Sequence, residues 1–223
     1  MAITFNTLMQ RLAYGELKNT AATKDCSLGE ISSNYRDLLL TLINKGLVDI
    51  YTNKLLKKDT VTVNIDTNQK IYPMVNISLP VPHITDVTYD PSLYIKPLCI
   101  TDNEGKEYIV DTCKLITTPS YDTLKFKQEL LDTIGSEVTV EYQALHGTIT
   151  YTDNINLPPN LETVLQLYVA ALYFNNLDAQ QHKDTGDRYF GLYLKYMSED
   201  TDKNLSSTSE IEEHDKFNMR GFV

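Results

Sequence analysis

Apolar residues near the start of the chain recur at the spacing of one helix face. They are Phe5, Leu8, Met9 and Leu12. Positions i, i+3, i+4 and i+7 fall on the same side of an α-helix, so this run is typical of a helix with one buried face. Thr4 comes directly before the run, and its side-chain oxygen can accept a hydrogen bond from a free N–H of the first turn. The pattern predicts a first helix with Thr4 as its N-cap.

A second helix is predicted to begin near Ser27. Ser27 and Glu30 have the spacing of a capping box, in which each side chain satisfies a free backbone N–H of the other residue. The apolar stripe that follows consists of Ile31, Tyr35, Leu38 and Leu42. Apolar positions continue at helical spacing beyond Gly46, so we expect this helix to run through the glycine.

The period of the pattern changes to two at residue 59. In TVTVNI (60–65) apolar residues alternate with polar ones, as expected for a strand with one buried face. DNEG (102–105) is predicted to be a hairpin turn in which Gly105 supplies a positive φ. Further strands are predicted at HITDVTY (83–89), KPLCITD (96–102), KEYIV (106–110), YDTLKF (121–126) and EVTVEYQAL (137–145). About five to seven short strands are enough for a small antiparallel sandwich or barrel.

Helical periodicity returns at LPPNLETVLQL (157–167). Pro158 or Pro159 is expected in the first helical turn, where proline is well tolerated. QQHKDTGD (180–187) is predicted to separate this helix from a fourth one, DRYFGLYLKYM (187–197). The fourth helix has one stripe of Tyr189, Leu192, Tyr193 and Tyr196, and a second stripe of Phe190, Leu194 and Met197.

These patterns together predict an α+β fold. Helices from both ends of the chain, residues 1–58 and 153–198, form one bundle. Residues 59–152 form an inserted antiparallel β-sandwich or barrel lobe. Residues 199–223 form an extended acidic arm without a core of its own, because their composition is acidic and serine-rich.

Composition narrows the class of protein. The formal net charge is -10 and the 20 basic residues are dispersed, which argues against a surface that wraps phosphate backbones. The densest basic group, KLLKKD (54–59), is interpreted as a solvated helix end. Three widely spaced cysteines indicate free thiols in a reducing compartment. The amino-terminal segment lacks the pattern of a signal peptide, and we expect no contact with a membrane.

Aromatic composition points to contacts between proteins. The chain has 15 tyrosines and no tryptophan, and tyrosine is enriched at protein interfaces. The segment LQLYVAALYFNNL (165–177) contains no charged residue, so it needs cover on nearly every side. Because one subunit with four helices is expected to cover this helix and the one after it incompletely, a second copy is predicted to complete the cover. The predicted subunit-interface residues are Leu167, Tyr173, Phe174 and Phe190.

The last residues, FNMRGFV (217–223), are less polar than the arm that precedes them. Phe217, Met219 and Phe222 are predicted to dock into pockets on a partner, folding as they bind. A frayed terminus is the other interpretation of this segment.

Catalytic chemistry is not indicated by any motif. The four histidines, His83, His146, His182 and His214, do not have metal-ligand spacing, and His182 is expected in a solvated interhelical loop. Neither a nucleophile elbow nor a glycine-rich phosphate loop is present. We therefore expect a protein that is not an enzyme, without catalytic, metal or cofactor-binding residues and without a cofactor.

An ordered series of segments resembles the head-to-tail connector adaptors of short-tailed bacteriophages, the tail tubular protein A-like family, and the ring proteins of crAss-like phages. The similarity extends over roughly residues 1–198. The segments that carry it are LINKGLVDIYTNKLLKKDTVTVNI (42–65), ITDVTYD (84–90), LCITDNEGKEYIVD (98–111), TPSYDTLKF (118–126), EVTVEYQALHGTI (137–149) and INLPPNLETVLQLYVAALYF (155–174). The arm after residue 199 has no counterpart that we can match.

The resemblance implies a structural virion protein of the phage neck, assembled in the bacterial host cytoplasm. Identical subunits would form a ring, usually of twelve copies, beneath the portal protein. The ring would join the capsid to the tail and contact the next tail or ring protein. DNA would pass through the lumen without specific binding, and a net negative wall would avoid trapping it.

Two other functions stay open at this point. The first is a carbohydrate-binding or accessory virion module, whose β lobe would present an aromatic platform drawn from Tyr72, Tyr89, Tyr94 and Tyr121. The second is a hydrolase, which would need a concave site that joins His83 or His146 to carboxylates.

Overall fold

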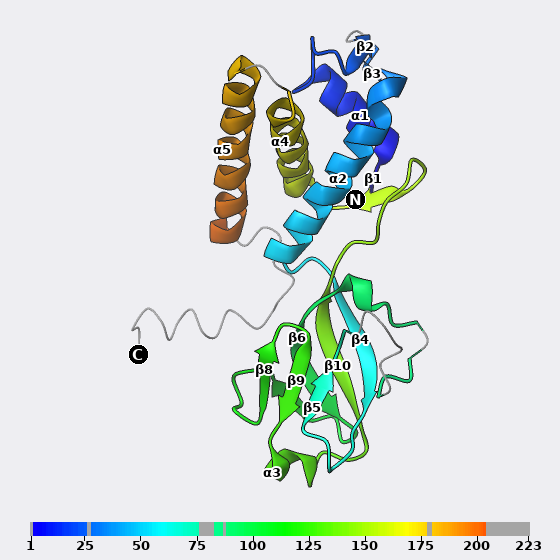
Figure 1. Cartoon of the computed structure of the whole chain (residues 1–223), viewed down its shortest axis with the longest axis vertical. Coiled ribbons are helices and arrows are strands. Elements are labelled where there is room, and N and C mark those ends of the chain that lie inside the picture. Colours follow the sequence, from blue (N-terminus) through cyan, green and yellow to red (C-terminus); the bar gives the residue numbers. More distant parts are fainter. Residues whose placement is uncertain (1, 26–27, 76–82, 87, 178–179, 204–223) are drawn as a thin grey trace. The chain divides into compact units, whose positions relative to one another are not determined.

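A computed structural model describes residues 2–25, 28–75, 83–86, 88–177 and 180–203. The chain divides into two compact units (Figure 1). Residues 1–56 and 148–223 make up the first, which we call the helical unit. Residues 57–147 make up the second, which we call the β unit. Each has its own core, so each is described separately.

Four helices and two small sheets build the helical unit. The helices are α1 (Phe5–Tyr14), α2 (Ser33–Asn53), α4 (Pro159–Asn175) and α5 (Gln180–Lys203). The strands are β1 (Ala2–Thr4) and β2 (Thr23–Asp25), with β3 (Glu30–Ile31) and β11 (Asn154–Asn156). Antiparallel pairing joins β1 to β11 and β2 to β3. Segments from the two ends of the sequence therefore meet in one unit.

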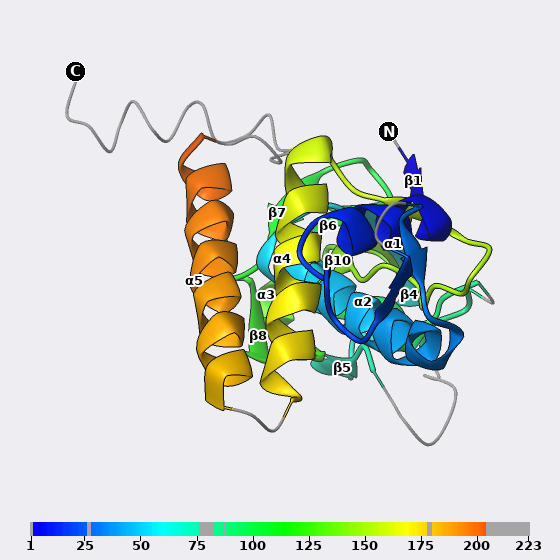
Figure 2. The same cartoon turned by 90° about the horizontal axis from the view of Figure 1, so that it is seen from above.

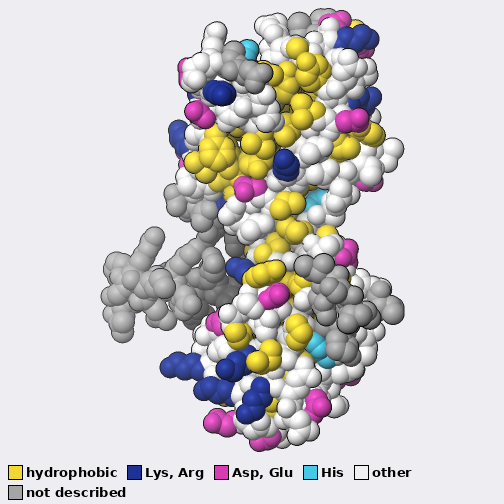
Figure 3. Space-filling model, viewed as in Figure 1, with side chains coloured by type: hydrophobic (Ala, Val, Ile, Leu, Met, Phe, Trp, Pro, Cys, Tyr) yellow, Lys and Arg dark blue, Asp and Glu magenta, His cyan; other side chains and the backbone are white. Residues whose placement is uncertain are grey.

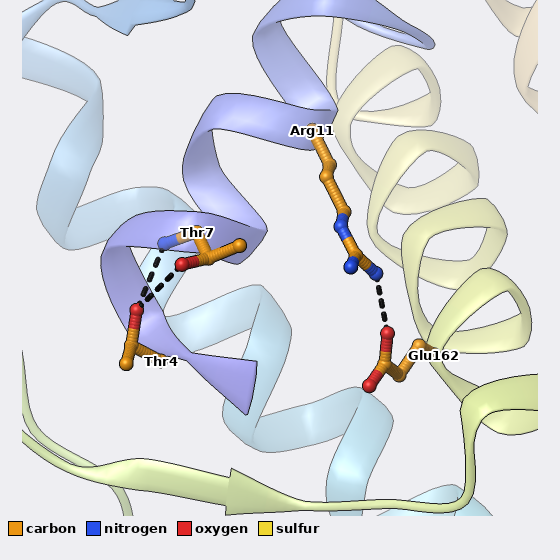
Figure 4. Close-up of polar contacts among 4 residues, drawn as sticks. All are labelled: Thr4, Thr7, Arg11 and Glu162. Carbon is orange, nitrogen blue, oxygen red and sulfur yellow. Dashed lines mark hydrogen bonds and ion pairs between the residues drawn. The ribbon is translucent and has the colours of Figure 1, made fainter. Parts of the chain in front are cut away.

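Helix α1 begins as predicted. The Thr7 backbone N–H donates to the Thr4 side-chain oxygen at 3.1 Å, so Thr4 is the N-cap (Figure 4). Farther along α1, Arg11 donates to the carboxylate of Glu162 in the first turn of α4. The Glu162 side chain is buried, and burial of a charged group is costly unless a group of opposite charge lies beside it. The ion pair links the first helix to one that begins about 150 residues later.

The predicted start of the second helix was wrong. Glu30 lies in β3 instead of a capping box, and α2 begins after Ser32; Ser27 is outside the described residues. Gly29 has φ +67°, in the left-handed region that a helix cannot contain. The chain turns at this glycine so that β3 can pair with β2, and only then enters α2.

Helix α2 does continue through Gly46, and packing explains why a glycine stands there. A Cβ atom at this position would lie 2.6 Å from Leu165 Cδ1 and 3.0 Å from Tyr168 Cδ1. Those two residues belong to α4, which crosses α2 at this point. The missing side chain lets the two helices approach closely.

Helices α4 and α5 run antiparallel, side by side (Figure 2). Pro159 is in the first turn of α4, as predicted. The predicted break at residues 180–187 was wrong, because α5 begins at Gln180 and includes them. Gly186 permits this packing: its Cβ would lie 2.1 Å from Asn175 Oδ1 and 3.0 Å from the carbonyl oxygen of Ala171. The helix also continues past the expected end at residue 198, to Lys203.

Two antiparallel sheets form the β unit. The four-stranded sheet has the order β4 (Lys58–Asn64), β10 (Glu137–Ala144), β6 (Tyr94–Asp102), β7 (Glu107–Ile109). The three-stranded sheet has the order β5 (Ile71–Pro73), β9 (Thr123–Phe126), β8 (Ile116–Ser120). A 3₁₀ turn, η1 (Pro91–Leu93), and a short helix, α3 (Gln128–Leu131), complete the unit.

Apolar side chains from both sheets share one core. In the register of the larger sheet, Val140 of β10 pairs with Val61 on one side and Ile100 on the other. Leu124 and Phe126 come to the same cluster from the smaller sheet. Neither sheet closes into a barrel within the described residues. The structure is thus of mixed α and β type with several antiparallel sheets.

One turn prediction and one strand prediction for this unit had different outcomes. The Gly105 N–H donates to the Asp102 carbonyl at 3.0 Å, and Gly105 has φ +82°, so the predicted hairpin turn is confirmed. The strand predicted at 83–89 was wrong: Ile84 makes a single bridge to Val63. The Asp86 carboxylate instead accepts the Thr88 N–H at 2.8 Å, which closes a local turn.

Candidate interaction surface on the helical unit

Helix α4 is almost fully enclosed by its own chain. The exposed fraction is 5% for Leu167, 1% for Tyr173 and 8% for Phe174. Close approach of α2 at Gly46 and of α5 at Gly186 brings a neighbouring helix against α4 at two places. This explains how a segment without charged residues is accommodated in a single chain.

Aromatic rings cover the far end of α4. Tyr189 of α5 stacks on Phe174 with ring centroids 5.7 Å apart, and His182 lies over the same ring at 6.1 Å. Tyr35 of α2 meets Tyr173 edge-on at 6.1 Å. Such pairs add about 0.5–1.5 kcal/mol to the stabilisation that burial provides. His182 is exposed and belongs to α5, not to the interhelical loop that the sequence predicted.

The premise behind the predicted subunit interface, that one subunit cannot cover both C-terminal helices, was wrong for α4. The other three helices of the unit cover α4, because two glycines allow contacts that the helical pattern alone does not reveal. Of the four predicted interface residues, only Phe190 is substantially exposed, at 39%. Participation of Leu167, Tyr173 and Phe174 in contacts between copies stays a prediction, and their present neighbours are in the same chain.

Two hollows on the helical unit share Asp49 of α2, and we call them together the α2–α5 groove. The first lies against α2 and Tyr168 of α4, and the second lies between α2 and α5. The first hollow, of about 610 Å³, is lined by Thr41, Asn44, Lys45, Val48, Asp49, Thr52, Thr148 and Tyr168. The second, of about 360 Å³, is lined by Asp49, Asn53, Lys54, Phe190, Tyr193, Leu194, Met197 and Ser198.

Large apolar side chains remain exposed along this groove. The exposed fraction is 46% for Val48 and 53% for Leu194. Figure 3 shows hydrophobic side chains gathered over the face of the helical unit between α2 and α5. Apolar side chains that gather on an otherwise charged surface mark a site of contact with another chain segment or protein.

Polar contacts hold the walls of the groove in place. The Tyr193 hydroxyl donates to the Asp49 carboxylate, and the Lys54 ammonium donates to the Met197 carbonyl at 3.0 Å. Burial raises the pKa of Tyr193, and Asp49 raises it further because a phenolate beside a carboxylate is unfavourable. Tyr193 therefore stays protonated and keeps donating to Asp49 at any physiological pH. The groove is preformed, with one carboxylate in its shared wall.

Sequence patterns had located only part of this surface. Phe190, Leu194 and Met197 form the second apolar stripe of the fourth helix, and all three line the groove. Val48 and Asp49 were missed, because an exposed valine and an aspartate on α2 carry no signal until α5 lies beside them. The stripe on α5 was the available signal.

The predicted docking residues Phe217, Met219 and Phe222 lie outside the described residues. His214 does as well.

The histidines of the β unit differ in environment. His83 is buried, with Nε2 2.8 Å from the carbonyl oxygen of Pro73 and its ring edge-on to Tyr72 at 5.1 Å. His146 is half-buried, with Nδ1 2.6 Å from the carbonyl oxygen of Gly147. In the part of the chain that the structure describes, no group of three or more His, Cys, Asp or Glu side chains could hold a metal ion.

The aromatic platform required by the carbohydrate-binding alternative is not formed. Tyr72 and Tyr94 are buried in the core of the β unit, and Tyr89 packs against that core with its hydroxyl donating to the Met74 carbonyl at 2.6 Å. Tyr121 alone of the four is well exposed, at 67%. One isolated ring is too little to form a platform.

Comparisons with known proteins had different outcomes. No protein-family model matches the sequence, and no curated protein matches it. Among solved structures, a chain in the neck of an empty GTA particle computed with C6 symmetry is similar, at 14% sequence identity. The similarity covers 85% of this chain and 92% of that chain, with a TM-score of 0.28. A TM-score of this size does not establish a common fold.

None of the described helices combines the length and the apolar character needed to cross a membrane.

Proposed function

We propose that this protein is a structural component of a phage-like virion, a head-to-tail adaptor. In this proposal identical copies form a ring beneath the portal, join the capsid to the tail and line the channel through which DNA passes. The resemblance of the ordered segments between residues 42 and 174 to the adaptor family supports it. Twelve copies per ring is the number that the resemblance implies.

The observation that carries the proposal is the apolar surface of the helical unit. Phe190, Leu194 and Val48 are exposed along the α2–α5 groove, although the chain encloses α4 efficiently. A second apolar pair, Tyr14 and Leu28, is exposed where Gly29 packs against the Tyr14 ring. Two different apolar patches suit a ring, because each copy in a ring offers one surface to the copy before it and another to the copy after it.

Charge and chemistry are consistent with a passive channel. The formal net charge of -10 favours a lumen that repels phosphate and lets DNA slide. We propose further that the protein is not an enzyme. Support comes from His83, which is buried in the β unit and bonded to a backbone carbonyl instead of pairing with a carboxylate.

The experiment is to mix the full chain with the portal protein of its own particle. Light scattering should report a complex that contains many copies, and electron microscopy should show a ring of them on the portal. Phe190→Asp should weaken the complex by placing a charge in the apolar contact. Tyr196→Asp is the matched control, since Tyr196 is similarly exposed on α5 but does not line the groove. A chain that stays monomeric with the portal would exclude the adaptor function.

A further inference from the structure

The smaller sheet of the β unit carries lysines on its exposed side. Lys125 of β9 pairs with Ile71 of β5 on one side and with Thr117 of β8 on the other. All three residues are exposed, whereas the next residue of β9, Phe126, is buried in the core. Because side chains alternate between the two sides of a strand, Lys125 and Lys127 lie on the same outward side. We call this exposed side of the smaller sheet the lysine face.

Two further lysines lie at the border of the lysine face. The Lys70 carbonyl accepts the Phe126 N–H at 2.9 Å, and Lys114 directly precedes Leu115, whose carbonyl accepts the Lys127 N–H at 2.9 Å. Figure 3 shows Lys side chains gathered over the part of the β unit that contains β8 and β9. Within the described residues, no ion pair joins any of these four lysines to a carboxylate. Like charges on one face repel one another, and carboxylates of a partner would relieve this repulsion.

A group of carboxylates lies elsewhere on the same unit. Asp59 of β4 pairs with Tyr142 of β10 in the larger sheet. The Tyr89 ring meets the Tyr142 ring edge-on at 5.7 Å, and the Tyr89 N–H donates to the Asp86 carbonyl at 3.3 Å. Asp90 directly follows Tyr89 in the chain. Asp59, Asp86 and Asp90 are therefore brought together around Tyr142, and we call these three residues the aspartate group.

The aspartate group carries a net negative charge. Hydrogen bonds from neighbouring side chains and backbone lower the pKa values of Asp86 and Asp90, so both are ionised at neutral pH. Lys57 Nζ lies 3.7 Å from Asp59 Oδ2 and offsets one of the three charges. Burial raises the pKa of Tyr142 to about 12, and the three carboxylates add to the rise because a phenolate beside them is unfavourable.

We propose that the lysine face of one copy binds the aspartate group of the next copy. The lysine face belongs to the three-stranded sheet, and Asp59 lies on β4 at the edge of the four-stranded sheet. One copy can therefore offer the two surfaces to two different neighbours, as the contacts around a ring require. The inference rests on the proposed assembly of identical copies. It assigns to that assembly a charged contact of the β unit, in addition to the apolar patches of the helical unit.

A protein surface suits the lysine face better than a nucleic acid does. Ile71 is 52% exposed and lies directly beside Lys125 in the sheet. An apolar side chain among the lysines favours a partner that supplies apolar atoms as well as carboxylates. Arginine, which binds phosphate through two parallel hydrogen bonds, does not occur between residues 57 and 147.

Cross-linking with a carbodiimide, which joins lysine to carboxylate side chains in direct contact, tests the proposal. The full chain is mixed in equal amounts with its isotope-labelled form, so that links between chains are distinguished from links within one chain. Concentrated protein is treated both alone and with the portal protein. Mass spectrometry should find links between chains from Lys125 or Lys127 to peptides that contain Asp59, Asp86 or Asp90.

The outcomes separate this contact from the proposed function. A ring on the portal whose links between chains lie elsewhere would overturn the contact and leave the adaptor function standing. The expected links in a chain that forms no ring would support the contact and exclude the adaptor function. Absence of the expected links from both samples would overturn the contact.

Charge substitutions supply the controls. Lys125→Glu should reduce the links from Lys127 to the aspartate group several-fold. Lys96→Glu is the matched control, because Lys96 is exposed on β6 of the larger sheet, and it should leave those links unchanged. Circular dichroism verifies that both variants are folded. A fluorescent single-stranded DNA oligonucleotide should not bind the wild type at physiological salt; binding that Lys125→Glu abolishes would overturn the proposal in favour of a nucleic acid.

Discussion

At the scale of single residues, two glycines determine how closely the helices approach one another. Gly46 and Gly186 are the points where α2 and α5 meet α4, and each faces atoms that a Cβ would touch. Thr4 closes the first turn of α1, and Asp49 accepts from Tyr193 across the groove.

Replacing Gly46 with alanine should destabilise the protein. Alanine favours a helix by about 1 kcal/mol over glycine, but overpacking of a core costs about 1–3 kcal/mol, and Leu165 is fully buried at the contact. We expect a net loss of about 1 kcal/mol in the free energy of unfolding, measured by urea denaturation. Gly191→Ala is the control, because no atom lies within 4 Å of its Cβ position. It should stabilise α5, and a gain in both variants would contradict the packing explanation.

Burial of His83 should make stability depend on pH. Burial lowers the pKa of His83 below its ordinary value, against the raising effect of the bond to the Pro73 carbonyl. Well above about pH 6.5, the ordinary pKa of histidine, the ring is neutral in both the folded and the unfolded chain. As the pH falls below that value, the unfolded state takes up the proton first, so the free energy of unfolding decreases. Denaturation between pH 7.5 and 5.5 should show a larger loss in the wild type than in His83→Gln.

At the scale of elements, the α4–α5 pair is the part that a neighbouring copy was predicted to complete. The chain by itself already buries nearly all of the apolar side chains of α4. Tyr189 on Phe174 and Tyr193 on Tyr168 are contacts of α5 with α4. The outer side of α5, with Phe190 and Leu194, is the side that remains exposed.

A pair of phenylalanine substitutions separates core packing from contact between copies. Phe174→Ala should reduce the free energy of unfolding of the monomer by about 3–5 kcal/mol, because a large buried ring is lost. Phe190→Ala should cost the monomer much less and should mainly affect assembly. Thermal denaturation at low protein concentration measures the first effect, and equal, small losses would mean that Phe174 does not act as a core residue.

At the scale of the whole molecule, two units with separate cores share one chain. Val140 and Ile100 belong to the core of the β unit, and Leu165 and Ile43 to the helical unit. The chain leaves the helical unit after residue 56 and returns to it at residue 148. The helical unit is therefore completed only by residues that follow the β unit in the sequence.

Separate cores should respond separately to cavity-forming substitutions. Val140→Ala should increase amide hydrogen exchange at residues 57–147, with little change elsewhere. Leu165→Ala should increase amide hydrogen exchange in the helical unit, with little change in the β unit. The physical reason is that a cavity lowers the free energy of the cooperative unit that contains it. Hydrogen-exchange mass spectrometry measures both, and exchange that rises equally in both units would indicate one cooperative core.

Local patterns were sufficient for features that depend on neighbouring residues. The apolar spacing of residues 5–12, the cap at Thr4, the turn at Gly105 and the first-turn Pro159 were all predicted and confirmed. In each case the deciding interactions lie within about four residues: a helical period, a side chain that caps its own turn, or the φ that a single residue can adopt. The strand at 60–65 was also predicted from a local pattern, the alternation of apolar and polar residues.

Features that depend on distant segments required the three-dimensional structure. The start of α2 moved because Gly29 turns the chain into β3, which pairs with β2. The cover of α4 depends on Gly46, more than a hundred residues earlier, and on Gly186 in the next helix. The spacing of apolar residues along a helix indicates that one face must be buried, but it does not indicate which segment buries that face. The α2–α5 groove exists because α2 and α5, which are far apart in the chain, lie beside each other around α4.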